Sequence, residues 1–97
     1  MATFVSLINW TEQGIKNFRD SPKRADAFRE VVEKNGGRVI SIYWTLGEYD
    51  IIAVTETPDD ETFTAIALTL GSLGNVRTAS LRAFDQAELK GIIEKAG

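Results

Sequence analysis

The tetrapeptide Gly47-Glu48-Tyr49-Asp50 is the stretch whose residue types come closest to a set of catalytic groups. A phenol donates a hydrogen bond and a carboxylate accepts a proton, so Tyr49 and Asp50 could act as donor and as acid or base at the mouth of a pocket. The same sequence is typical of a tight turn in which Asp50 binds nearby backbone amides. The turn is the favoured interpretation, because no partner of contrasting pKa accompanies the pair.

Three further side chains could contact a ligand or a partner. Arg82 could bind an anion through two parallel hydrogen bonds, although a structural ion pair is the favoured role. Trp10 and Trp44 stand at the ends of predicted strands. We expect them to be packing or interface residues, with the stacking of an aromatic ligand as the alternative.

Other motifs that resemble sites have simpler explanations. The acids of Asp59-Asp60-Glu61 are expected at a helix start, where the helix dipole favours them, rather than around a cation. Gly71-Ser72-Leu73-Gly74-Asn75 follows a predicted helix instead of preceding one, so the nearby dipole end repels phosphate. The chain has no histidine and no cysteine, which removes the commonest general base, the usual zinc ligands and thiol chemistry. We therefore predict no metal site and no cofactor.

Length and charge narrow the classes of protein further. The 97 residues are enough for a single domain, residues 1–97, and too few for two. A net charge of −3 provides no basic surface for nucleic acid or for an anionic membrane. The N-terminal segment lacks the features of a signal peptide, and no apolar run has transmembrane length. We expect a cytoplasmic protein.

The elements that must position these residues are four strands and three helices. Arg38–Thr45 and Tyr49–Glu56 are rich in branched and aromatic residues and are joined through Leu46-Gly47-Glu48, which predicts a hairpin. Thr3–Trp10 and Val76–Ala83 are the other predicted strands. The order predicts an α+β domain, a ferredoxin-like βαββαβ unit with a four-stranded antiparallel sheet, helices on one face and an extra C-terminal helix.

The helices are recognised by their caps and apolar spacing. Thr11 is expected to cap a first turn, and the helix restarts at Ser21-Pro22, with serine as cap and proline in the first helical position. Charged residues of this helix, Arg24 among them, are expected to face water. Thr57-Pro58-Asp59-Asp60 opens the second helix, with threonine as its predicted cap. Asp85 begins the short final helix.

The two faces of the predicted sheet differ in composition. Alternate residues of a strand point to opposite faces, and we assign the cleaner apolar set to the helices. That set is Val5, Leu7, Ile40, Ile42, Ile52, Val54, Ala79, Leu81 and Ala83. The opposite face mixes large apolar and hydroxyl residues, and we predict that a second subunit covers it because monomers rarely expose so large an apolar patch. The interface candidates are Phe4, Ile8, Trp10, Trp44, Ile51 and Val76.

Several motifs, in this order and spacing, resemble the GYD domain family of small bacterial and archaeal proteins. They are Leu46-Gly47-Glu48-Tyr49-Asp50, the run Thr57–Glu61, the run Gly71–Thr78 and Leu81-Arg82-Ala83-Phe84. The signature residues correspond to Gly47, Tyr49 and Asp50, with Glu48 inserted. The resemblance implies a dimeric α/β barrel, in agreement with the covered face. It implies no particular activity, because proteins of related fold include cofactor-independent monooxygenases, haem enzymes and regulatory ligand-binding modules.

We therefore expect a homodimer, or a higher oligomer of dimers, that binds a small organic ligand between sheet and helices or at the dimer interface. The residues expected to line the ligand are Ser6, Tyr43, Tyr49, Asp50, Ser80 and Arg82. Two alternatives stay open. One is a cofactor-independent monooxygenase-like enzyme, and the other is a purely structural or regulatory oligomer whose cavity is filled by side chains.

Overall fold

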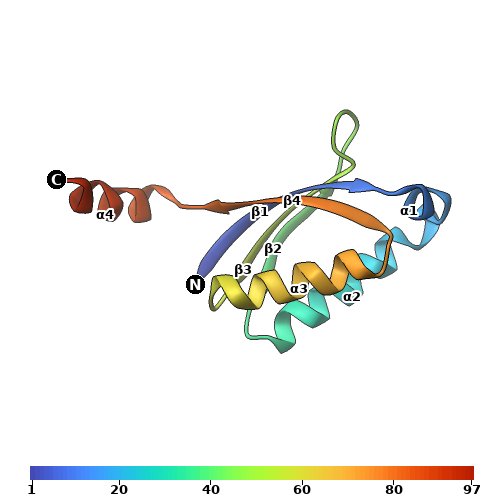
Figure 1. Cartoon of the computed structure of the whole chain (residues 1–97), viewed down its shortest axis with the longest axis horizontal. Coiled ribbons are helices and arrows are strands. Elements are labelled where there is room, and N and C mark those ends of the chain that lie inside the picture. Colours follow the sequence, from blue (N-terminus) through green and yellow to red (C-terminus); the bar gives the residue numbers. More distant parts are fainter.

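The computed structural model describes residues 1–97 as an antiparallel sheet with helices packed against it (Figure 1). In chain order the elements are β1 Ala2–Trp10, α1 Glu12–Lys16, the 3-10 helix η1 Phe18–Asp20, α2 Ser21–Lys34, β2 Arg38–Trp44, β3 Ile51–Thr57, α3 Asp60–Ser72, β4 Val76–Ala83 and α4 Gln86–Ala96. The α+β class and the βαββαβ order are confirmed. The four strands lie in the order β2-β3-β1-β4, which is compatible with a ferredoxin-like fold.

Two of the helix caps are the residues predicted from the sequence, and two others differ from the prediction. Thr11 accepts a hydrogen bond from the Gly14 amide, and Asp85 forms a capping box at the start of α4, as predicted. The cap of α3 is Asp59, because Thr57 is still the last residue of β3. Ser21 is likewise the first residue of α2 and not its cap. Its hydroxyl faces inward instead.

The helices α2 and α3 cover one side of the sheet and leave the other side open (Figure 1). They run in opposite directions, and α2 packs on β2 while α3 packs on β3 and β4. The loop between β2 and β3 rises on the open side. It is closed by a hydrogen bond from the Thr45 amide to the Asp50 carbonyl, 2.8 Å long.

The C-terminal helix α4 projects beyond the end of β4, away from the rest of the chain (Figure 1). None of its residues is buried. The radius of gyration is 14.5 Å, whereas a compact chain of this length is expected to have roughly 12.5 Å. The apolar residues of this helix therefore find no cover within the chain itself.

The predicted assignment of sheet faces is wrong for β1, β3 and β4. The face that mixes apolar and hydroxyl residues is the one beneath the helices. Phe4 of β1 stacks on Phe63 of α3, with ring centroids 4.0 Å apart and an interplanar angle of 6°. One hydroxyl pair on this face is satisfied by mutual hydrogen bonding, the 3.0 Å contact between the Oγ atoms of Ser6 and Ser80. A large ring and the Ser6 hydroxyl are thus buried on the same face of β1.

Four of the six interface candidates are consequently corrected. Phe4, Ile8, Ile51 and Val76 are buried under the helices and are not available to a second subunit. Trp10 and Ile42 pack against the cluster that Ile8, Ile51, Ala53 and Val76 form. Trp44 also turns toward the helices, where its indole N–H donates to the Ser21 hydroxyl over 2.9 Å.

A bulge in β2 explains why its assignment is partly correct. Val39 pairs with Thr55 and Ile42 with Ala53, and the register shifts between Val39 and Ser41. The extra residue, Ile40, changes which face the later residues occupy. Ile42 therefore faces the helices as predicted, whereas Ile40 remains 47% exposed.

Candidate functional site

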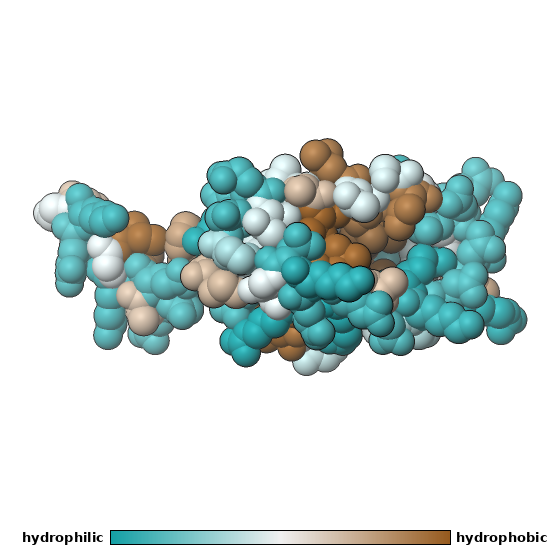
Figure 2. Space-filling view, turned by 90° about the horizontal axis from the view of Figure 1, so that it is seen from below, coloured by the Kyte–Doolittle hydropathy of each residue, from teal (hydrophilic) through white to brown (hydrophobic).

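An apolar cavity of about 160 Å³ lies between the sheet and the two long helices. Figure 2, which views the molecule from the side of the helices, shows apolar atoms gathered in a hollow there. Its lining is Ile8, Ser21, Arg24, Ala25, Ala27, Phe28, Val31, Ile42, Trp44, Ile51, Ala53, Ile66, Thr69, Leu70, Leu73, Asn75 and Val76. The cavity exists because α2 and α3 pack on different strands and present alanines as well as larger residues to the space between them.

Two polar residues of the lining, Arg24 and Asn75, lie next to the α1 segment. Arg24 donates to the carbonyls of Asn17 and Gly14, over 3.2 and 3.5 Å. A Cβ built on Gly14 would clash with the Asn75 carbonyl oxygen, so this loop also lies next to Asn75. Ser21 begins the helical turn that contains Arg24. The Arg24 guanidinium and the Asn75 backbone thus both lie next to Gly14.

The rest of the lining is almost entirely apolar. Ile8, Ile51, Ala53 and Val76 form its floor as one buried cluster of the sheet. Aliphatic and aromatic side chains of α2 and α3 form the walls. The lining includes no aspartate and no glutamate, and Arg24 is its one charged residue. The arrangement suits an apolar molecule with a single polar end.

The six residues predicted to line a ligand do not converge on one site. Ser6 and Ser80 lie beneath α3 beside a void of only about 10 Å³, next to the cavity but outside its lining. Tyr43 stands on the open side of the sheet, 65% exposed. Arg82 lies near the other end of β4, where it donates to the carbonyls of Thr3 and Ala83.

Arg82 has the environment of a structural residue. Its Nε atom lies 3.5 Å from Asp60. The guanidinium also lies over the Phe84 ring, 4.5 Å from the ring centroid, and 5.7 Å from that of Phe4. The contact with Asp60 is the kind of ion pair favoured from the sequence, and cation–π contacts with two phenylalanine rings accompany it.

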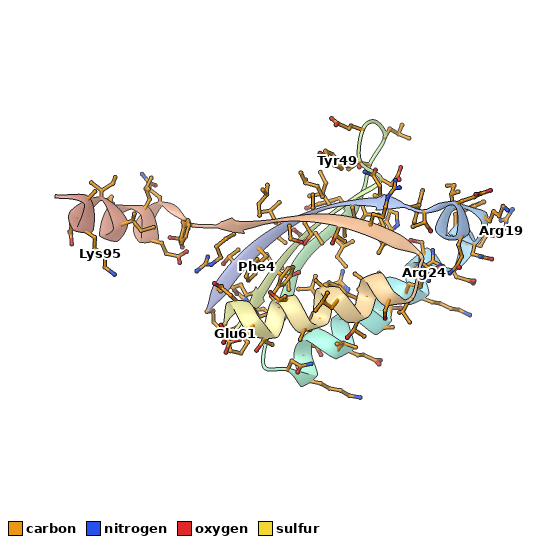
Figure 3. All side chains as sticks on the ribbon, viewed as in Figure 1. Phe4, Arg19, Arg24, Tyr49, Glu61 and Lys95 are labelled. Carbon is orange, nitrogen blue, oxygen red and sulfur yellow. The ribbon has the colours of Figure 1, made fainter.

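Tyr49 lies in the loop on the open side, whereas Arg24 lies on the helix side (Figure 3). Asp50 follows Tyr49 in the chain and directly precedes β3. The Asp50 carboxylate accepts a hydrogen bond from the Trp10 amide over 2.9 Å, and the Asp50 amide donates one to the Ile8 carbonyl. Asp50 therefore continues the pairing of β1 just beyond the end of β3, in the role of a turn residue. Neither residue belongs to the cavity lining, so proton transfer by this pair would not reach a molecule bound there.

Sequence reasoning misses the polar residues at the end of the cavity. The helical pattern assigns Arg24 to the solvent side of its helix, and the Ser-Pro pair predicts Ser21 as a cap. Asn75 stands out only as part of a loop that ends α3. The proline after Ser21 is a usable signal, because it places Ser21 and Arg24 on the first turn of one helix.

The pKa of Asp59 is held below its ordinary value by its hydrogen bonds with Thr62, from the side chain first and then from the backbone N–H. This carboxylate caps α3 and lies outside the cavity.

The structure brings no three His, Cys, Asp or Glu side chains together around a potential metal position. None of the helices has the length and hydropathy needed to span a bilayer.

Comparisons with known proteins agree with the resemblance seen in the sequence. The model of the GYD domain matches residues 4–93. A Thermus thermophilus protein named "Glutamine synthetase and cystathionine beta-lyase binding protein" is 34% identical over 90 residues, which cover 92% of this chain and 95% of that protein. The crystal structure of TTHA0845, also from Thermus thermophilus, superposes with a TM-score of 0.54 at 25% identity, over 88% of this chain and 95% of that one. The chain belongs to the GYD domain family.

Proposed function

We propose that this protein binds a small apolar molecule in the cavity between its sheet and its helices, and that it does so as a cytoplasmic homodimer. Family membership and the name of the Thermus relative support a binding or regulatory role. The observation that carries the ligand proposal is the cavity itself, about 160 Å³ of space with an apolar lining. For comparison, an apolar cavity of about 150 Å³ is large enough to bind benzene.

The test is an NMR titration that measures the binding of 1-hexanol, an uncharged molecule of suitable size. Ala53→Leu would fill part of the cavity, because Ala53 is 1% exposed and lies in its floor. The matched control is Ala65→Leu in α3, an exposed position outside the lining. We expect saturable binding to the natural chain and to the control, and at least tenfold weaker binding to Ala53→Leu.

Overpacking can destabilise the fold by about 1–3 kcal/mol. Ala25→Leu, on the wall formed by α2, therefore serves as a second cavity-filling variant. Equal binding of 1-hexanol to both filled variants and to the control, or no binding to the natural chain, would refute the ligand proposal.

The homodimer proposal rests on the open side of the sheet. The residues that point there, by their register, include Val5, Leu7, Ile52, Val54, Ala79 and Leu81. No helix covers this side (Figure 1). Leu81 is 54% exposed, and Tyr43 is exposed on the same side. An apolar sheet face of this kind is normally buried, so we propose that a second copy packs against it.

Analytical sedimentation tests the dimer. Leu81→Lys places a charge on the open face and is expected to convert the dimer to a monomer. Leu68→Lys, on α3 and 70% exposed, makes the same change on the helix side and should leave the dimer intact. A natural chain that sediments as a monomer at micromolar concentration would contradict this part of the proposal.

A second candidate function is the binding of another protein. The relative's name describes a protein that binds two enzymes. In this chain α4 carries exposed apolar residues, Leu89, Ile92 and Ile93, on a helix that projects from the domain (Figure 1). A helix of this kind could lie in an apolar groove of a partner. Adding a peptide of residues 84–97 should compete with such a partner and should not affect 1-hexanol binding.

A further inference from the structure

The one charged side chain in the cavity lining lacks an acidic partner. The ion pairs of the chain join Lys16 to Glu12, Arg38 to Glu56 and Arg82 to Asp60. Arg24 instead donates to two backbone carbonyls, which are neutral. A half-buried guanidinium beside an apolar wall loses hydration without gaining a counter-charge. An anion at this end of the cavity would supply that charge.

Hydrogen-bond donors remain available around the same point. A guanidinium has five N–H groups, and the contacts with Asn17 and Gly14 use one on each terminal nitrogen. The Asn75 side chain accepts from Gln13 through Oδ1, so its amide N–H groups stay free to donate. The Ser21 hydroxyl accepts from the Trp44 indole and keeps its own hydrogen.

The apolar remainder of the cavity limits what can accompany the anion. Apart from Ser21, Arg24, Thr69 and Asn75, the side chains of the lining are aliphatic or aromatic. The Thr69 hydroxyl already donates to the Ala65 carbonyl. A second charge or a chain of hydroxyls would be buried there without partners. The volume of about 160 Å³ is enough for a short alkyl chain or one aromatic ring.

From this geometry we infer that the cavity binds a small amphipathic monocarboxylate, with its carboxylate at Arg24 and Asn75 and its apolar tail between the sheet and the helices. This inference rests on the proposed ligand-binding function and assigns the chemical class of the ligand. Arginine binds a carboxylate with paired, charge-assisted hydrogen bonds. Such hydrogen bonds contribute enough to change affinity by tenfold or more.

The test compares hexanoate with 1-hexanol, which has the same chain length and no charge, by NMR titration at constant ionic strength. Arg24→Gln removes the charge and keeps a polar side chain. Arg29→Gln makes the same change on the same helix, outside the lining. We expect Arg24→Gln to weaken hexanoate binding at least tenfold, while 1-hexanol binds as before and Arg29→Gln binds both probes like the natural chain.

A second variant decides the question if Arg24→Gln loses its fold through the missing contacts to the α1 segment. Asn75→Asp keeps the shape of the side chain and the oxygen that accepts from Gln13. It places a negative charge beside the expected carboxylate, so hexanoate binding should again fall at least tenfold and 1-hexanol binding should not. Arg24→Lys keeps the charge without the paired geometry and should retain part of the affinity that Arg24→Gln loses.

The outcomes separate the two proposals. If 1-hexanol binds in the cavity but neither Arg24→Gln nor Asn75→Asp distinguishes hexanoate from it, the carboxylate inference is overturned and the proposed function stands. If neither probe binds the natural chain, the proposed function fails, and this inference fails with it. Loss of both probes in a variant that keeps its fold would overturn the inference as well, because Arg24 would then shape the cavity without selecting the ligand.

Discussion

The stacked pair Phe4 and Phe63 gives the sharpest test of which sheet face the helices cover. Phe4 is 7% exposed and Phe63 is 6% exposed, and their parallel rings lie 4.0 Å apart. Truncation of either ring to alanine is expected to cost about 3–5 kcal/mol. The whole domain is expected to have a free energy of unfolding of roughly 5–15 kcal/mol. Leucine replacements, which keep most of the apolar volume, are therefore the safer perturbation.

A double-mutant cycle measures the contact between the two rings. Phe4→Leu and Phe63→Leu should each lower the free energy of unfolding by about 1 kcal/mol. The double variant should lose less than the sum of the two, with a coupling energy of about 0.5–1 kcal/mol, because the aromatic contact can be lost only once. Urea denaturation followed by circular dichroism provides all four values.

Phe18→Leu supplies the matched control for this cycle. Phe18 lies in η1, is 48% exposed, and should show a coupling energy with Phe63→Leu within about 0.3–0.5 kcal/mol of zero. The reasoning would be refuted if Phe4→Leu changed the free energy of unfolding by less than about 0.5 kcal/mol, as expected for a surface position. A coupling energy of zero between Phe4 and Phe63 would refute it equally.

Three further predictions concern stability. Thr55→Val should leave stability unchanged or raise it, because the buried Thr55 hydroxyl has no partner, whereas Thr57→Val should lower it because that hydroxyl donates to the Asp59 carbonyl; urea midpoints compare the two. Gly14→Ala should destabilise strongly, since its Cβ would clash with a backbone oxygen, and an unchanged melting temperature would contradict this. The pKa of Asp59 is lower in the folded chain than its ordinary value of 3.8, so the ionised carboxylate stabilises the fold at any pH above 3.8. This contribution is lost as the pH falls through the folded pKa. The stability gap between the natural chain and Asp59→Asn should therefore be present near neutral pH and close in acid; a gap that does not depend on pH would show that Thr62 does not set this pKa.

The order of the elements and some of their boundaries could be predicted because local signals specify them. Val76–Ala83 is a strand with the predicted bounds, and the hairpin loop lies where Gly47 allows a positive φ of 129°. The capping box at Asp85 marks α4 in the same way. These features depend on residues that are neighbours in the sequence.

The choice of sheet face could not be made by the same reasoning. Both faces of β1 carry large apolar residues, so alternation alone does not determine which face is buried. The serines at positions 6 and 80 look unfavourable for a core, but they lie opposite each other in the register and bind one another. This hydrogen bond depends on the pairing of β1 with β4, two segments that are distant in the sequence. The bulge at Ile40, which reverses the alternation within β2, also has no local signal.

The sequence also predicts the wrong position for the candidate site, because that position depends on contacts between distant segments. Tyr49 and Asp50 attract attention as titratable residues, yet the structure uses Asp50 to bind the Trp10 amide. Arg24 resembles any solvent-facing residue of an amphipathic helix, and its position at the cavity depends on where α1 and the loop before β4 meet. Only the three-dimensional arrangement brings Arg24 and Asn75 to the same end of the cavity.

Intermolecular nuclear Overhauser effects from bound 1-hexanol to the methyl groups of the protein would test the central claim most directly. The cavity and the open sheet face present different methyl groups from the same strands. We predict contacts to Ile8, Ala53 and Val76, which form the floor of the cavity. Contacts to Leu7 and Val54 on the open face, without any to the floor, would contradict the account of where this protein binds its ligand.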